Sequence, residues 1–221
     1  MKKVLLLIPA FLLAFQISKA QTEKGSQTLG VNVGFNYQKS KNLSFNPYDN
    51  SSFNSTIKTT GFSIGPNYSY FIADKLDIGA NLNYADYSLD DNSPNYPTNR
   101  DSHEYSAQIF LRKYFMYGNK LGIRTGPYFE YSRYNTKYTY SGADVIYNNS
   151  EKIKGYSAGI NLGLVYYPSK SLGVSANLAN LSYNHTKSDN DKQGNGSSDN
   201  FNAGFISNNL ALSVFYVFSA K

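Results

Sequence analysis

The sequence predicts an all-β protein, an eight-stranded antiparallel up-and-down transmembrane β-barrel. Three observations lead to this fold class: strict two-residue alternation, a second face that is small rather than charged, and alternating long and short connections. Residues 60–85 show the alternation best, as two strands around a turn at Ala73, Asp74 and Lys75. Period two indicates a strand with one apolar face. In the first strand the large side chains and the small ones interleave as Phe62, Ile64, Pro66, Tyr68 and Tyr70 against Gly61, Ser63, Gly65, Asn67 and Ser69.

The composition of the second face indicates which face meets lipid. A strand face washed by water is normally rich in Lys, Glu and Asp, whereas here it carries Gly, Ser, Asn and Thr. Small residues suit a crowded interior, so the large apolar set is expected to face outward into lipid. The alternative is a soluble exported barrel of the lipocalin kind, with the apolar face inside.

The remaining strands follow the same pattern. We expect them at about 28–38, 104–115, 121–134, 155–167 and 172–183, with a last one ending at Phe218. Near Ala179 and Asn180 the alternation slips by one residue, which predicts a β-bulge. The strands are joined in turn by short turns and by four long polar segments, 39–58, 86–102, 135–154 and 184–202. Membrane barrels have short periplasmic turns and long extracellular loops, so both termini are expected in the periplasm.

The first twenty residues read as a secretory signal peptide, removed after Ala20, which leaves 21–221 as the barrel domain. Lys2 and Lys3 precede an apolar run, and Ser18 and Ala20 suit the cleavage site. An uncleaved anchor is the alternative, but the run is short for a span. The chain has no cysteine, so no disulfide is expected. The formal charge of +6 falls to +3 without Lys2, Lys3 and Lys19, too little to indicate nucleic-acid binding.

Aromatic residues gather where strands meet connections, and membrane barrels carry aromatic girdles at both interfaces. We expect the periplasmic girdle at Tyr70, Phe71, Tyr114, Phe115, Tyr117, Tyr166, Tyr167 and Phe218, and the outer one at Tyr37, Tyr84, Tyr105, Tyr131, Tyr156 and Tyr183.

With its hairpin from Gly61 to Leu76 and its alternating end from Leu210 to Phe218, the chain resembles the OmpA/OmpX-type eight-stranded outer membrane proteins, often described as porin-like. The cleavage region is similar to those of Bacteroidota. The resemblance implies a location in the outer membrane of a Gram-negative cell envelope, and an assembly signal read by the outer membrane insertion machinery at Leu210, Leu212, Val214, Tyr216 and Phe218. Family members commonly end at the aromatic residue, whereas Ser219, Ala220 and Lys221 follow here.

Five charged residues fall on the small, polar face of their strands: Asp77, Glu104, Arg112, Arg124 and Glu130. Eight strands enclose an interior just wide enough for side chains, and buried charges need partners. We expect these five to form a paired network that plugs the lumen. The alternative is that they line an ion path.

Two further patterns are candidate sites. His103 and His185 lie near serines and aspartates at strand ends, as a lipid-modifying enzyme would need, but exposed loop histidines are the simpler interpretation. Asp189 to Gly194 resembles the start of a calcium loop, yet Asn200 stands where the bidentate Glu belongs. No catalytic residue, metal or cofactor is therefore expected.

The sequence thus favours a monomeric, non-enzymatic outer membrane protein with a structural or surface-interaction role. Its expected partners are the outer membrane lipids, the assembly machinery and extracellular partners that contact the long segments. A narrow channel for small solutes and a lipid-modifying enzyme are the alternatives.

Overall fold

The computed structural model describes residues 21–46, 51–93, 98–118, 120–141, 146–190, 194–205 and 210–219. The expected signal peptide, 1–20, lies outside these ranges. Within them, no helix is long and apolar enough to cross a membrane. The described residues form nine strands: β1 Gln27–Asn46, β2 Ser51–Ala73, β3 Leu76–Asp91, β4 Thr98–Tyr117, β5 Leu121–Ser141, β6 Ile146–Tyr166, β7 Leu172–Asn190, β8 Gly194–Phe205 and β9 Leu210–Phe218.

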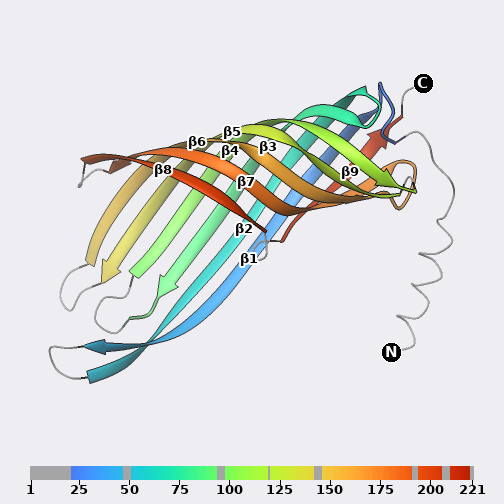
Figure 1. Cartoon of the computed structure of the whole chain (residues 1–221). Helices are drawn as coiled ribbons and strands as arrows, with labels where there is room; N and C mark the ends of the chain where they lie inside the picture. Colours follow the sequence, from blue (N-terminus) through green and yellow to red (C-terminus); the bar gives the residue numbers. More distant parts are fainter. Residues whose placement is uncertain are drawn as a thin grey trace, which may run out of the picture.

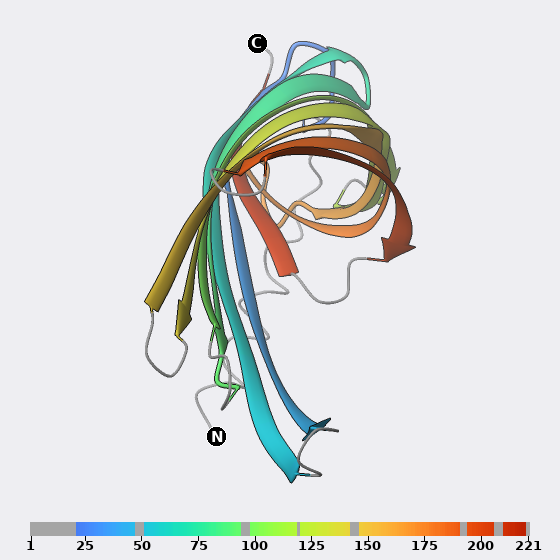
Figure 2. The same cartoon turned by 90° about the vertical axis from the view of Figure 1, so that its left-hand side faces the viewer.

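The strands close into a ring in which every neighbour is antiparallel (Figure 1). The strands β1 to β7 pair in chain order, β7 pairs with β9, and β9 pairs with β1. β8 and β9 together occupy the place of the expected eighth strand, because they pair with successive parts of β7. β8 pairs with Ala179–Asn190 and β9 pairs with Leu172–Ala176. In Figure 2, β8 lies alongside β7 and β9 lies beside β1. The ring therefore has the expected eight positions.

The two ends of the barrel differ in their connections. At one end, called the turn end below, β2–β3, β4–β5 and β6–β7 are joined closely, and Gln27 at the start of β1 faces Phe218 at the end of β9. Lys75 and Gly118 in two of these turns have φ of 60° and 58°, a left-handed conformation typical of tight turns. The other end, called the hairpin end, carries the connections from β1 to β2, β3 to β4, β5 to β6 and β7 to β8.

The strands are longer than the alternation predicted. β1 was expected to end near Gln38, but it stays paired with β2 until Asn46 faces Ser51. The other long segments behave alike, so most of 39–58, 86–102, 135–154 and 184–202 is strand rather than loop. Twenty residues of strand reach roughly 65 Å, far beyond an apolar band of about 25 Å. Beyond lipid both faces meet water, so the apolar alternation ends while the backbone hydrogen bonds continue.

The predicted bulge in β7 is confirmed. Leu162 of β6 faces Ala179, but the next residue, Gly163, faces Asn177, which leaves Leu178 as an extra residue. A bulge of this kind restores the pattern, because a one-residue slip moves side chains to the opposite face. Leu181 and Tyr183 consequently face outward, with 41% and 50% exposure.

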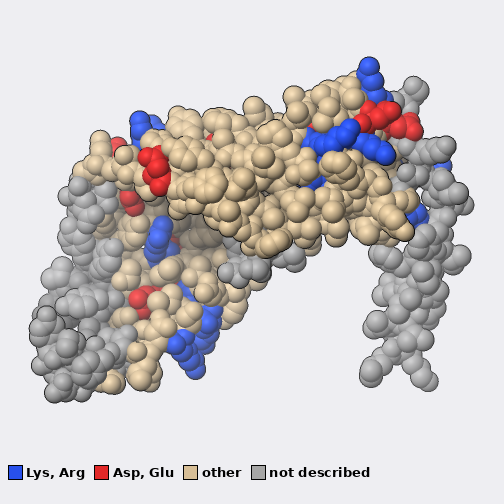
Figure 3. All heavy atoms as spheres, in the orientation of Figure 1, with Lys and Arg blue, Asp and Glu red and all other residues tan. Residues whose placement is uncertain are grey.

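The large apolar side chains point away from the lumen along the barrel. Leu29 is 51% exposed and Ile109 is 62% exposed, whereas Ser69 and Ser106 on the opposite face are buried. Figure 3 shows the charged side chains gathered toward the two ends, with a broad uncharged region between them. An uncharged apolar outer surface requires an apolar surrounding. The lipocalin alternative, with its apolar face inside, is therefore excluded.

Candidate functional site

An apolar plug fills the lumen at the turn end. It consists of side chains from four strands and the β6–β7 turn, all at most 3% exposed, with Met116 packed against them: Phe71, Tyr114, Val165, Tyr167, Phe215 and Val217. The rings of Phe71 and Tyr114 lie 5.3 Å apart between centroids, and those of Tyr167 and Phe215 lie 5.8 Å apart, edge to face. Such pairs add to the stabilisation that burial supplies. Water is thus displaced from this end of the lumen.

The plug corrects the expected periplasmic girdle. Phe71, Tyr114 and Tyr167 belong to the expected girdle, but all three point into the lumen and are essentially buried. Parity would have shown this: Phe71 follows Ser69 by two residues, and Tyr114 follows Arg112 by two. The girdle prediction was wrong for these three residues because it used only their position near the strand ends. Phe115, Tyr117 and Phe218 do face outward, with exposures between 49% and 85%.

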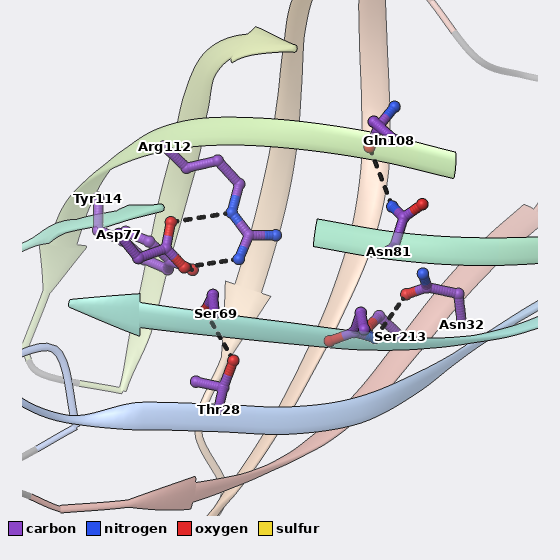
Figure 4. A network of polar contacts seen from close by, with 10 residues as sticks. Thr28, Asn32, Ser69, Asp77, Asn81, Gln108, Arg112, Tyr114 and Ser213 are labelled. Atoms are coloured by element: carbon purple, nitrogen blue, oxygen red, sulfur yellow. Dashed lines mark hydrogen bonds and ion pairs between the residues drawn. The ribbon is translucent and has the colours of Figure 1, made fainter. Parts of the chain in front are cut away.

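An ion pair lies on top of the plug (Figure 4). Asp77 of β3 accepts hydrogen bonds from Arg112 Nε at 3.0 Å and from Arg112 Nη2 at 2.6 Å. The Tyr114 hydroxyl also donates to Asp77 Oδ2, at 2.9 Å. The Arg112 guanidinium lies 3.8 Å from the ring centroid of Phe110, within cation–π distance. Arg124 of β5 hydrogen-bonds to the Tyr114 oxygen, which adds a second buried guanidinium to a site with one carboxylate.

Glu104 and Glu130 lie apart from this pair. Glu130 accepts a hydrogen bond from Gln108 Nε2 at 3.1 Å, and Gln108 in turn accepts one from Asn81 at 2.9 Å (Figure 4). Glu104 is hydrogen-bonded to Tyr134. Among the described residues neither glutamate is ion-paired with an arginine or a lysine. The five charges thus form two groups rather than the one expected network, because the cations lie toward the turn end and the glutamates toward the hairpin end.

Between the plug and the hairpin end lies a polar cavity of about 280 Å³. Arg112, Arg124, Glu104 and Glu130 all line it, together with serines and asparagines from the strands around the ring. Asn67 of β2 donates to Asn32 Oδ1 of β1 at 2.9 Å and to Ser213 of β9 at 3.1 Å, so these bonds link three neighbouring strands on the lumen face. A polar cavity of this size holds several water molecules. The lumen is therefore solvated above the plug and dry within it.

The first described residues cross the mouth of the barrel at the turn end. The backbone of Thr22 accepts a hydrogen bond from Lys75 N in the β2–β3 turn, at 2.7 Å. Lys24 N donates to Asp74 Oδ1 in the same turn, at 2.9 Å. The side chain of Gln21 reaches the carbonyl of Ser169 in the β6–β7 turn. These two turns are on opposite sides of the ring, so the segment lies over the plug.

The histidines are outside the cavity lining. His103 pairs with Asp86 at 2.8 Å on β3 and β4, and His185 pairs with Asp199 at 2.8 Å on β7 and β8. In the described part of the chain neither has a serine hydroxyl as a partner. The candidate calcium segment includes residues 191–193, outside the described ranges, and no group of three or more metal-ligating side chains occurs within those ranges.

The residues expected as an assembly signal form β9. Leu212, Val214, Tyr216 and Phe218 face outward, and Leu210 faces Phe35 in the pairing with β1. The intervening Phe215 and Val217 enter the plug. One strand therefore both closes the ring and fills its interior.

A closed antiparallel ring with an apolar exterior, a polar lumen and an uncharged middle band defines a transmembrane β-barrel protein. The chain belongs to the family described as outer membrane protein beta-barrel domain, whose model matches residues 19–182. This family places the protein in the outer membrane.

The chain is similar to solved structures of outer membrane proteins. The chain is similar to the outer membrane protein OprG from Pseudomonas aeruginosa, with 13% identity, a TM-score of 0.50 and coverage of 90% of this chain and 99% of that one. A major outer membrane protein from Thermus thermophilus matches with 12% identity and a TM-score of 0.44, over 87% of this chain and 99% of that one. The attachment invasion locus protein Ail of Yersinia pestis matches with 10% identity and a TM-score of 0.39, over 88% and 99%. Among curated protein sequences nothing matches.

Proposed function

We propose that this outer membrane barrel is a structural and surface-interaction protein rather than an enzyme or an open pore. The apolar plug carries the proposal, because six side chains at most 3% exposed fill the lumen at the turn end. The buried Asp77–Arg112 pair and the segment that contacts both turns add two further layers. A lumen with these layers serves stability rather than passage.

In this proposal the signal peptide is removed after Ala20, and the turn end lies in the periplasm with both termini. The paired hairpins then extend from the outer surface. Their length supports contact with partners, since β1 and β2 stay paired well past the aromatic Tyr37. The protein acts as a monomer held by outer membrane lipids, after the insertion machinery has read the segment Leu210–Phe218.

A narrow channel is the second candidate, and the polar cavity of about 280 Å³ is the observation that favours it. A solute entering from the hairpin end would meet Glu104 and Glu130 before the two arginines. The plug would have to move before the solute could leave. Conduction thus requires a second conformation of Tyr114 and its neighbours.

Planar-bilayer recording separates the two candidates. We expect no conductance from the wild-type protein, and new conductance steps from the double variant Tyr114→Ala/Phe215→Ala, which removes two plug rings. A matched variant, Phe115→Ala/Tyr216→Ala, removes two outward rings and should stay silent. Each variant is first checked for a mobility change on boiling, which shows a folded barrel. Regular steps from wild-type protein would reject the sealed lumen and favour the channel.

A further inference from the structure

A row of cations runs across three neighbouring strands on the outer face of the barrel. Arg133 of β5 directly faces Lys154 of β6, and Lys154 directly faces Lys187 of β7. All three side chains are exposed. Directly opposed like charges destabilise a sheet, and their Cβ atoms lie about 5 Å apart in such pairs. A row of this kind therefore lowers stability, and a bound anion would relieve the repulsion.

Few acids lie near this row. Asp189 faces Lys152, and Lys152 is itself one step beyond Lys154 on the same face. Within the described residues none of Arg133, Lys152, Lys154 and Lys187 takes part in an ion pair. Together with Asp189 and polar residues of β7 and β8 these four side chains line a hollow of about 590 Å³. The surface is thus concave and net positive, with four cations against one carboxylate and no ion pair between them within the described residues.

The position of the row along the barrel axis shows which layer of the membrane surrounds it. Tyr131 and Tyr156 face each other across β5 and β6, with ring centroids 5.3 Å apart. Such rings mark the membrane interface. Arg133 and Lys154 each lie two residues farther toward the hairpin end on the same outward face, which is about 7 Å along a strand. The polar headgroup layer is about 5 to 7 Å thick on each side, so the row lies at headgroup level.

The row is confined to part of the circumference. At the same height on β3 and β4, directly beyond Tyr84 and Tyr105, Asp86 faces His103 and pairs with it. A separate pair of facing cations, Lys39 and Lys58, lies on β1 and β2 two residues beyond Tyr37. The positive surface on β5–β7 is therefore a local feature and not a uniform belt.

We propose that the cation row Arg133, Lys154 and Lys187, with Lys152 beside it, binds the phosphate groups of a phosphorylated glycolipid in the outer leaflet. The proposal rests on the proposed function, since it needs the hairpin end to lie outside the cell. Charge complementarity selects an anion, and the outward direction and height select a membrane lipid over a solute in the lumen. Bound phosphates would also relieve the repulsion between the facing cations.

The test titrates lipid A with both phosphates into the folded protein in zwitterionic detergent, and counts bound lipid by native mass spectrometry. We expect saturable binding that salt weakens. Arg133→Gln/Lys154→Gln/Lys187→Gln should bind on the order of a hundredfold more weakly, at about fivefold per cation. A control with the same loss of charge at the turn end, Lys24→Gln/Lys113→Gln/Lys170→Gln, should bind like wild type. Lipid A without phosphates should bind wild type as weakly as the triple variant binds the phosphorylated form.

Equal binding by wild type and the triple variant, or equal binding of the dephosphorylated lipid, would overturn the proposal. Binding of heparin through the same residues without binding of lipid A would overturn it too, because the surface would then serve a soluble polyanion. All variants are checked for heat-modifiable mobility. If the folded protein does not bind lipid A, this inference alone is rejected. If the protein fails to form a lipid-embedded barrel, the proposed function is rejected as well.

Discussion

Replacing Asp77 with Asn isolates the contribution of the buried ion pair. Asp77 is fully buried and accepts three hydrogen bonds, two from Arg112 and one from Tyr114. The amide keeps the shape but removes the negative charge next to Arg112 and Arg124. Breaking a buried pair by removing one partner costs about 3–5 kcal/mol. Tyr114→Phe keeps the ion pair and removes the hydroxyl's hydrogen bonds with Asp77 and Arg124. Because no charge is removed it should cost less, about 1.5–3 kcal/mol.

The assay is equilibrium unfolding by urea of the protein in detergent micelles, with the folded fraction read from mobility on unboiled gels. We expect the free energy of unfolding to fall in the order wild type, Tyr114→Phe, Asp77→Asn. The double variant Asp77→Leu/Arg112→Leu should recover part of the loss, since an apolar replacement of a buried pair is often neutral. If Asp77→Asn lowers the free energy of unfolding less than Tyr114→Phe does, the charge of Asp77 is not the main source of stability in this layer and the reasoning is refuted.

Three further outcomes follow from single positions. Gly126→Ala should cost about 1–3 kcal/mol in the same unfolding assay, because the added Cβ would lie 1.9 Å from the Leu111 carbonyl oxygen, whereas Gly204→Ala has open space and should be neutral. Deleting Leu178 should be tolerated, as judged by heat-modifiable mobility, because β6 and β7 then pair without a bulge, while deleting Leu164 from the regular part of β6 should reduce folding. Asp199 lies beyond the membrane-spanning part, where the hydrogen bond from the Tyr183 hydroxyl at 2.6 Å, and then the contact with His185, hold the pKa of its carboxyl below the usual value. Tyr183→Phe should therefore raise the pKa of Asp199 in a carbon-13 NMR titration, and an unchanged midpoint would count against the hydrogen bond. Because the folded-state pKa is depressed, the stabilisation from Asp199 is present above the ordinary carboxyl pKa. It is lost as the pH falls through the folded-state pKa.

The alternation in the sequence was sufficient to predict the closed ring, the outward direction of the apolar face and the bulge in β7. Lipid outside the barrel and crowding inside it select the residues of each strand separately, so each strand carries the pattern by itself. It did not show where strands end. Past Gln38 the side chains on both faces of β1 are mostly polar, so the periodic signal stops although the pairing with β2 continues.

The plug was predictable in part and the charge partners were not. Phe71 and Tyr114 share parity with Ser69 and Arg112, so the inward direction was present in the sequence. The partner of each charge depends on how neighbouring strands are staggered around the ring, which no local pattern records. Asp77 faces Arg112 in the β3–β4 pairing, whereas Glu130 faces Gln108 in the β4–β5 pairing.

The central claim, a lumen open to water above a dry plug, is tested most directly by cysteine labelling, since the chain has no native cysteine. Ser106→Cys places a thiol on the cavity lining, and Val165→Cys places one in the plug. In intact cells a small membrane-impermeant thiol reagent should label the first and leave the second unmodified, and boiling in detergent should expose both. Equal labelling of both positions before denaturation would contradict the sealed lumen.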